Sequence, residues 1–203
     1  MAEVAAIVLA AGRASRFSGG AEGRTKLTAT LAGKALVRRA VEAALGAGAR
    51  PVVVVTGHAR DAVMTALAGL DIEEAHNPDY AKGIASSVRT GLAATPASAA
   101  GALVFLGDMP RVTGDLGARL IATFGADPTL DAVAPLVAGR RGNPVLLSRS
   151  LFDAAMRLEG DEGARRLLAR DGVRVAEVPV EDDVAALDID TPDALAALRD
   201  DRS

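Results

Sequence analysis

The stretch Val4-Ala5-Ala6-Ile7-Val8-Leu9, followed directly by Ala10-Ala11-Gly12, is the most informative part of the sequence for the fold. Val4–Leu9 is apolar throughout, without alternation between polar and apolar residues, which is typical of a strand buried on both faces of a sheet. The small residues that follow allow the backbone to approach a ligand closely. We therefore expect a central parallel strand with a ligand-facing turn at its carboxyl end.

Short apolar runs alternate with helix-length amphipathic segments along the rest of the chain. Further strands are expected at 51–55, 71–75, 102–106, 132–137, 144–147 and 173–178, and helices at 37–45, 59–70, 85–94, 116–124 and 163–169, with a last helix beginning at Thr191-Pro192. This alternation predicts an α/β fold with a doubly wound, mostly parallel sheet and helices on both faces. Because no repeat or long linker divides the chain, we expect one domain over residues 1–203.

Composition narrows the class of protein. The chain has 203 residues, a formal net charge of -3, five aromatic residues and no cysteine. Scattered basic residues and few aromatic rings argue against a nucleic-acid-binding protein. The apolar runs fall far short of the ~20 residues that cross a bilayer, so no membrane partner is expected. The absence of cysteine excludes disulfides and thiolate chemistry and fits a reducing cytosol, so we expect a cytoplasmic protein.

The turn after the first strand carries candidate anion-binding groups. Gly12, Arg13 and Arg16 follow the strand, and Lys26 comes after a Gly-rich loop. Ligands of doubly wound sheets bind outside the carboxyl ends of the strands, and backbone N–H groups with basic side chains suit a triphosphate. A tight turn with solvated basic residues is an equal alternative. The stretch matches neither a P-loop nor a G-x-G-x-x-G motif, which disfavours an ATPase or a conventional dinucleotide-binding protein.

Two aspartates are candidate metal ligands. Asp108 directly follows the strand expected at 102–106, where a carboxylate can hold Mg²⁺ together with substrate phosphates. A structural turn before Pro110 is the alternative. Asp190 precedes Thr191-Pro192, and helix capping can explain that pattern without a metal.

A polar loop that begins at Asn77 runs into the helix expected at 85–94. Ser86 and Ser87 at the start of this helix could hold a ribose or a phosphate, or they could simply cap the helix. His58 and His76 are isolated in the sequence and are weak metal candidates.

Several motifs together resemble one family. Leu-Ala-Ala-Gly-x-x-x-Arg-Phe (9–17) with the later Lys26-Leu27 resembles the signature of MobA-like nucleotidyltransferases. Asn-Pro-x-Tyr-x-x-Gly-x-x-Ser-Ser (77–87), Leu-Gly-Asp-Met-Pro (106–110) and Asp-Ile-Asp-Thr-Pro-Asp (188–193) resemble its later motifs, in the same order. Segments 141–145 and 160–165 are similar to the molybdenum cofactor cytidylyltransferase branch.

This resemblance implies a Rossmann-like nucleotidyltransferase fold and a Mg²⁺-dependent reaction. CMP, or less readily GMP, would pass from a nucleoside triphosphate to the terminal phosphate of a molybdopterin-type cofactor, and pyrophosphate would be released. Leu-Ala-Ala-Gly goes with cytidine in this branch, whereas Leu-Ala-Gly-Gly is more typical of guanosine. A molybdoenzyme or its chaperone would be a protein partner.

The resemblance also implies a set of site residues. The catalytic residues would be Lys26, Arg16 and Asp108, with Asp108 and Asp190 as the metal ligands. The nucleotide would lie on Leu9, Ala10, Ala11, Gly12, Arg13, Lys26, Gly83, Ser86 and Ser87. The acceptor would lie on Arg141, Gly142, Asn143, Asp161 and Arg165.

The chain departs from the family pattern in places. About five extra residues separate Arg16 from Lys26, and the family's Gly-Lys-Pro is replaced by Gly33-Lys34-Ala35. If the longer loop does not fold back, Lys34 or Arg24 could take the place of Lys26. Two other functions stay open at this point: an NAD(P)H-dependent oxidoreductase on the same scaffold, and a non-catalytic carrier of the molybdopterin cofactor.

Overall fold

A computed structural model describes residues 3–13 and 25–180. Its central strand, β1 (Val4–Ala10), is buried at all seven positions. It pairs in parallel with β4 (Val52–Thr56) on one side and with β6 (Gly101–Leu106) on the other. Alternate residues of β1 enter two different cores: Ala6 and Val8 face one, and Ile7 and Leu9 face the other. A strand between two apolar layers has no polar face, which explains the unbroken apolar run.

The main sheet has eight strands in the order β10-β7-β9-β6-β1-β4-β5, with β8 paired to β7. The remaining strands are β5 (Glu73–His76), β7 (Ala132–Val137), β8 (Arg140–Arg141), β9 (Val145–Ser148) and β10 (Val175–Pro179). Strands β8 and β9 run antiparallel to their neighbours, whereas the other pairings are parallel. The mostly parallel α/β sheet predicted from the sequence is confirmed.

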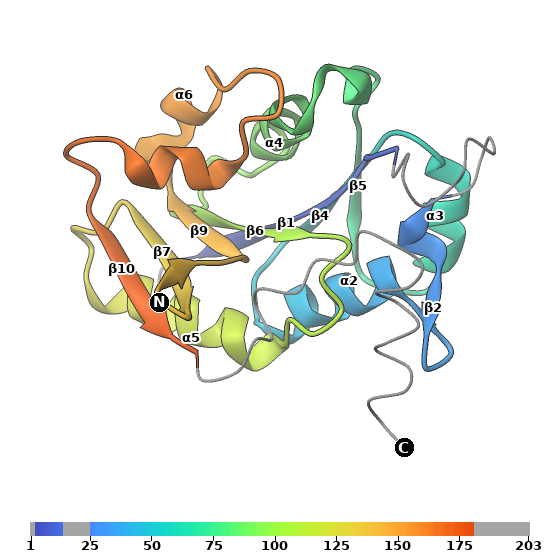
Figure 1. The fold of residues 1–203 in the computed structure, drawn as a ribbon, viewed down its shortest axis with the longest axis horizontal. Helices are drawn as coiled ribbons and strands as arrows, with labels where there is room; N and C mark the ends of the chain where they lie inside the picture. The colour runs from blue at the N-terminus through green and yellow to red at the C-terminus, as the bar shows by residue number, and fades with distance from the viewer. Residues whose placement is uncertain (1–2, 14–24, 181–203) are drawn as a thin grey trace.

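Helices cover both faces of this sheet (Figure 1). Helices α2 (Leu36–Gly46) and α5 (Gly114–Ala126) lie against one face, and α4 (Ile84–Ala93) and the short α6 (Phe152–Ala155) lie against the other. Short 3₁₀ helices complete the set: η1 (Lys26–Thr28), η2 (Tyr80–Lys82), η3 (Arg149–Leu151) and η4 (Ala164–Ala169). None of the helices within the described residues is long and apolar enough to cross a membrane.

Helix α4 packs closely on the sheet because it carries a glycine at the contact. A Cβ added at Gly91 would lie 2.4 Å from Cγ2 of Ile7. The absence of a side chain therefore lets the start of α4 reach the carboxyl ends of the central strands. The site described below depends on this placement.

Three predicted helices differ from the expectation or cannot be compared with it. The helix expected at 59–70 is shorter, because α3 (Arg60–Ala66) ends before Leu67, whose φ is -99°, and Gly69 adopts a φ of +81°. Positive φ stops an α-helix, and the spacing of apolar residues alone did not reveal it. The segment expected at 163–169 forms the 3₁₀ helix η4. The helix expected from Thr191 lies outside the described residues.

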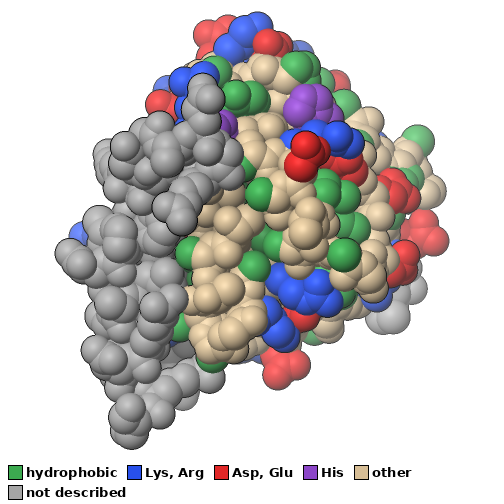
Figure 2. All heavy atoms as spheres, turned by 90° about the vertical axis from the view of Figure 1, so that its right-hand side faces the viewer, with side chains coloured by type: hydrophobic (Ala, Val, Ile, Leu, Met, Phe, Trp, Pro, Cys, Tyr) green, Lys and Arg blue, Asp and Glu red, His purple; other side chains and the backbone are tan. Residues whose placement is uncertain are grey.

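Basic and acidic side chains lie next to each other on the face drawn in Figure 2. An ion pair joins α3 to β5: Nε and Nη2 of Arg60 each donate to a carboxylate oxygen of Glu74 at 2.7 Å. The guanidinium holds the pKa of Glu74 below its usual range, and a hydrogen bond from Oγ1 of Thr56 acts in the same direction. Glu74 therefore has a structural role: its carboxylate ties α3 to the edge strand β5.

Candidate active site

A cleft of about 530 Å³ opens at the carboxyl ends of the central strands. Its volume lies within the range of small-molecule sites. Five segments contribute walls: the end of β1 with Gly12 and Arg13, the start of η1, the turn after β6, the loop from Tyr80 to Ser87, and Asp161. The structure thus brings together segments that are about 100 residues apart in sequence, as expected for a doubly wound sheet.

Lys26 and Asp108 meet in this cleft. Nζ of Lys26 lies 2.5 Å from Oδ2 of Asp108, and the two side chains are 13% and 20% exposed. Each is placed by its local structure. Thr25 accepts a hydrogen bond from the backbone N–H of Leu27 and so starts η1 at Lys26. The N–H of Gly107 donates to the carbonyl of Leu9, which ties the turn before Asp108 to β1.

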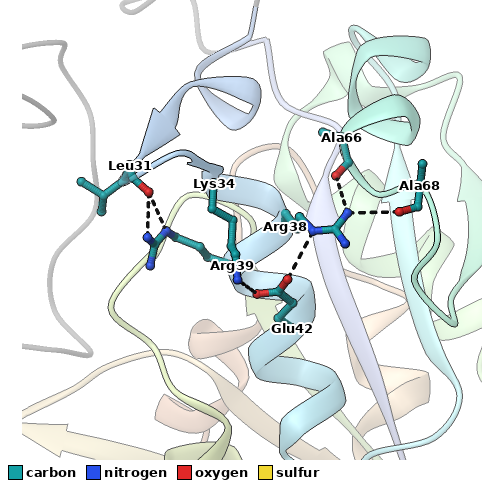
Figure 3. A network of polar contacts seen from close by, with 7 residues as sticks. All are labelled: Leu31, Lys34, Arg38, Arg39, Glu42, Ala66 and Ala68. Atoms are coloured by element: carbon teal, nitrogen blue, oxygen red, sulfur yellow. Dashed lines mark hydrogen bonds and ion pairs between the residues drawn. The ribbon is translucent and has the colours of Figure 1, made fainter.

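The longer loop before Lys26 does not keep this lysine away from the cleft. Lys34, the substitute suggested by the sequence, is held elsewhere: its Nζ lies 2.5 Å from a carboxylate oxygen of Glu42 on α2. Figure 3 shows this contact within a network that fastens the hairpin of β2 (Thr30–Leu31) and β3 (Lys34–Ala35) to α2. In the same network Arg38 bonds Glu42, and Arg39 donates to the carbonyl of Leu31. Arg24 and Arg16 lie outside the described residues.

The turn after β1 carries the residues predicted to bind a nucleotide. Leu9, Ala11, Gly12 and Arg13 line the cleft, whereas Ala10 is fully buried and does not. The guanidinium of Arg13 lies 5.4 Å from the centre of the Tyr80 ring, within the range of a cation–π contact. Tyr80 is a wall residue that the sequence reasoning missed as a candidate, although it stands inside the quoted motif 77–87.

Gly83, in the loop from Tyr80 to Ser87, contacts the segment that contains Asp161. Its backbone has φ +102° and ψ 171°, a region that is essentially restricted to glycine. An added Cβ would lie 2.2 Å from the carbonyl oxygen of Gly160, and that oxygen accepts a hydrogen bond from the N–H of Ala85 at 3.0 Å. Two loops 77 residues apart therefore meet backbone to backbone at this point.

The serines at the start of α4 do not cap the helix. The helix begins at Ile84 after Gly83, and no side chain caps it. Ser87 lines the cleft, whereas Ser86 turns away from it: Oγ of Ser86 lies 2.8 Å from the carbonyl oxygen of Gly83 and 3.1 Å from that of Asp79. The capping interpretation is wrong because the loop bends at Gly83, one turn earlier than the serines.

A second lobe of about 400 Å³ adjoins the first and shares Leu9, Ile84, Leu106 and Asp161 with it. Of the residues predicted to bind an acceptor, Asn143, Asp161 and Arg165 line this lobe. Arg141 and Gly142, both within the described chain, do not. Arg141 bonds Glu177 and the carbonyl of Leu168, while its own carbonyl accepts from Arg165. The N–H of Gly142 donates to the carbonyl of Pro135. Both residues therefore bond to neighbouring segments of the protein and do not line the lobe.

The donor chemistry of the cleft fits a cation that is shared with a substrate. Within residues 3–13 and 25–180 there is no cluster of three or more His, Asp or Glu side chains that could hold a metal ion. Mg²⁺ is usually bound by one or two carboxylates together with waters and substrate phosphates, and among the described residues Asp108 and Asp161 line this cleft. Asp190 lies outside the described residues.

Comparison with known proteins places the chain in a family. The model of the MobA-like NTP transferase domain matches residues 6–176. The molybdenum cofactor cytidylyltransferase of Escherichia coli is 32% identical over 195 residues, which cover 95% of this chain and 94% of that protein. The bifunctional protein GlmU of Sorangium cellulosum is 32% identical over 161 residues. The match to GlmU covers 76% of this chain but only 33% of that protein.

Solved structures agree with this placement. The crystal structure of Rv0371c from Mycobacterium tuberculosis superposes with a TM-score of 0.85 at 28% identity, covering 98% of both chains. A structure of the same protein in complex with manganese gives a TM-score of 0.81 at 27% identity and the same coverage. The family model and these relatives lead to one conclusion: the chain, with a paired lysine and aspartate at its strand ends, belongs to the MobA-like NTP transferase domain family.

Proposed function

We propose that this nucleotidyltransferase transfers CMP from CTP to the terminal phosphate of a molybdopterin-type acceptor and releases pyrophosphate, with GTP as a less favoured donor. Two features of the chain support this choice. The cytidylyltransferase of Escherichia coli matches almost the whole chain, and the turn after β1 reads Leu-Ala-Ala-Gly. The observation that carries the proposal is the Lys26–Asp108 pair, which lies in a two-lobed cleft with room for a nucleotide beside an acceptor.

The reaction needs alignment more than it needs a nucleophilic side chain. A phosphate oxygen of the acceptor attacks the α-phosphorus of the triphosphate, and the bond from this phosphorus to the oxygen of the β-phosphate breaks. A phosphate monoester has a second pKa of about 6, so it is already ionised near neutral pH. The two lobes would hold the acceptor phosphate next to the α-phosphorus in the orientation that the attack requires. The reaction then takes place within one complex and does not need an encounter between free molecules.

Positive charge around the first lobe stabilises the leaving pyrophosphate. Lys26, Gly12 and Arg13 line the same space, and Arg16 would add to them. Groups that are fixed before the reaction stabilise developing charge without having to reorganise. Asp108, with Asp190, would hold Mg²⁺, which when bound supplies positive charge to the phosphate oxygens.

The second lobe would take the acceptor. Arg165 carries the positive charge that a phosphate needs, and the carbonyl of Arg141 holds its guanidinium at 3.0 Å. Asn143 and Asp161 offer hydrogen-bonding groups beside it. Asp161 lines both lobes, so the acceptor and the nucleotide would approach each other there.

A pyrophosphate-release assay tests this function. The chain is mixed with CTP, GTP or ATP, with and without molybdopterin, and with Mg²⁺ or a chelator. We expect release with CTP that depends on both the acceptor and Mg²⁺. Asp108→Asn should lower the rate by orders of magnitude, because the variant loses a charge that holds the metal. Asp153→Asn should leave the rate unchanged, because Asp153 is an exposed carboxylate in the first turn of α6 that does not line the cleft.

Other outcomes would point to other functions. Binding of molybdopterin without pyrophosphate release would indicate a carrier. Stabilisation by NADPH in preference to the nucleoside triphosphates in a thermal-shift panel would indicate an oxidoreductase, because a ligand that binds only the native state raises its stability. Near-normal turnover of Asp108→Asn would remove this aspartate from the mechanism.

A further inference from the structure

Asn77 is a buried amide next to the cleft that none of the roles above uses. It directly follows β5, and its backbone N–H donates to the carbonyl of Thr56 at the end of β4 at 2.8 Å. Its side chain is only 1% exposed. Asn77 is therefore fixed to the carboxyl edge of the sheet, at the start of the loop that leads from β5 to α4.

The orientation of this amide is set by a backbone donor. The N–H of Asp79 lies 2.9 Å from Oδ1 of Asn77, and an N–H donor requires the oxygen of the amide as its partner. Nδ2 must then face the other way, toward α4. There it donates to Oγ of Ser86 at 2.9 Å and to Oγ of Ser87 at 3.0 Å. Both amide hydrogens are used, one on each hydroxyl.

These bonds give the two serine hydroxyls different hydrogen-bonding roles. A hydroxyl has one proton and two lone pairs. The Ser86 proton has carbonyl acceptors at Gly83 and Asp79. Ser87 accepts from Asn77, and the described part of the chain places no acceptor for its proton. Because Ser87 lines the cleft, its O–H is left to donate to a ligand there.

We propose that Asn77 is a positioning residue of the nucleotide lobe, which by donating to Ser87 makes this serine a hydrogen-bond donor toward an acceptor atom of the bound nucleotide. This role rests on the proposed function, since it concerns the same lobe. It explains why a fully buried amide joins the sheet edge to α4 at this place. It also makes the strength of nucleotide binding depend on a side chain that does not line the cleft.

The substitution Asn77→Asp reverses this polarity at nearly constant shape. The carboxylate of this variant still accepts from the N–H of Asp79, but it has no hydrogen to donate. The serine hydroxyls would then turn their protons toward it, and Ser87 would present only lone pairs to the ligand. We expect CTP affinity, measured by calorimetry with Mg²⁺, to fall roughly tenfold, the equivalent of one hydrogen bond between the protein and the ligand.

A double-mutant cycle with Ser87→Ala separates positioning from general damage. Each single variant should weaken CTP binding by a similar factor, and the double variant should be no weaker than either, because both changes remove the same bond. Independent losses that multiply in the double variant would overturn the role of Asn77. If Asn77→Asp does not fold, Asn77→Ser takes its place in the cycle. Its shorter side chain no longer orients Ser87 but offers the Ser87 proton no carboxylate, so we expect a smaller loss of CTP affinity that is again not additive with Ser87→Ala.

Thr95→Val is the matched control. Thr95 is also a buried polar residue of this helix region, and its Oγ1 donates to the carbonyl of Gly91 at 3.1 Å, at the end of α4 far from the cleft. We expect it to lower the melting temperature and leave CTP affinity unchanged. An equal loss of affinity in this variant would mean that any damage to α4 weakens binding, and would overturn the proposal. Absence of CTP binding by the unmodified chain would instead overturn the proposed function, and this role with it.

Discussion

Replacement of Gly83 by alanine should damage both the stability of the chain and its cleft. The backbone conformation at this position is strained for any residue with a Cβ, at a cost of about 1–3 kcal/mol. The new methyl group would also stand 2.2 Å from the carbonyl oxygen of Gly160, where ordinary contact begins near 3.4 Å. The two loops must therefore separate, and the Ala85–Gly160 hydrogen bond is lost, which costs about 0.5–1.5 kcal/mol. Together these effects predict a loss of about 2–4 kcal/mol in the free energy of unfolding.

Gly172→Ala isolates the strain from the clash. Gly172 also has a positive φ, +80°, but nothing lies within 4 Å of an added Cβ. This variant should lose only the conformational part, about 1–2 kcal/mol. Urea denaturation followed by circular dichroism gives both values, and calorimetry gives the affinity for CTP and for molybdopterin.

The expected pattern is specific to a contact that joins two loops. Gly83→Ala should be less stable than Gly172→Ala and should bind both proposed substrates more weakly, because Gly83 lines the first lobe and Asp161, next to Gly160, lines both lobes. Gly172→Ala should bind both normally. Equal stability of the two variants, or normal binding of both substrates by Gly83→Ala, would refute the claim that this contact holds the lobes together.

Three further predictions concern other parts of the chain. Lys26→Ala should weaken the binding of a nucleoside triphosphate roughly tenfold or more and that of a monophosphate less, as expected for a charged contact to the outer phosphates. Lys34→Ala should change the affinity for neither ligand. Equal losses of affinity for both ligands in calorimetry would indicate a structural role for Lys26. Gly91→Ala should lower the free energy of unfolding by about 1–3 kcal/mol through overpacking against β1. Gly125→Ala, where an added Cβ meets nothing within 4 Å, should leave this free energy unchanged or raise it. Similar melting temperatures of the two variants would contradict the tight contact at Gly91. The depressed pKa of Glu74 stabilises the fold above the pKa of the unfolded chain, ~4.3, and this stability is lost as pH falls through the lower pKa of the folded state. Glu74→Gln should therefore reduce the loss of stability between pH 5 and pH 3, and an unchanged pH dependence would argue against the pairing.

Much of the candidate site could be predicted because its residues follow strands that are recognisable locally. The apolar run of β1 predicts burial on both faces, and the position of Asp108 directly after β6 predicts that it reaches the same edge of the sheet as Gly12. Parallel neighbouring strands end at the same edge, so this inference needs no knowledge of distant contacts. The proximity of Lys26 to this aspartate could not be predicted in the same way, because a loop of unusual length precedes the lysine.

The sequence by itself determined most strands and helices of the main sheet and which end of the sheet carries the candidate site, since the periodicity of burial can be read in short windows of residues. Tertiary structure alone decided the antiparallel course of β9, the contact between Gly83 and Gly160, and the placement of Arg141 behind the second lobe instead of on its wall. Each of these depends on residues tens of positions apart that meet only after folding. A local pattern of side chains predicts which face of a segment is buried, but it does not predict which distant segment packs on that face.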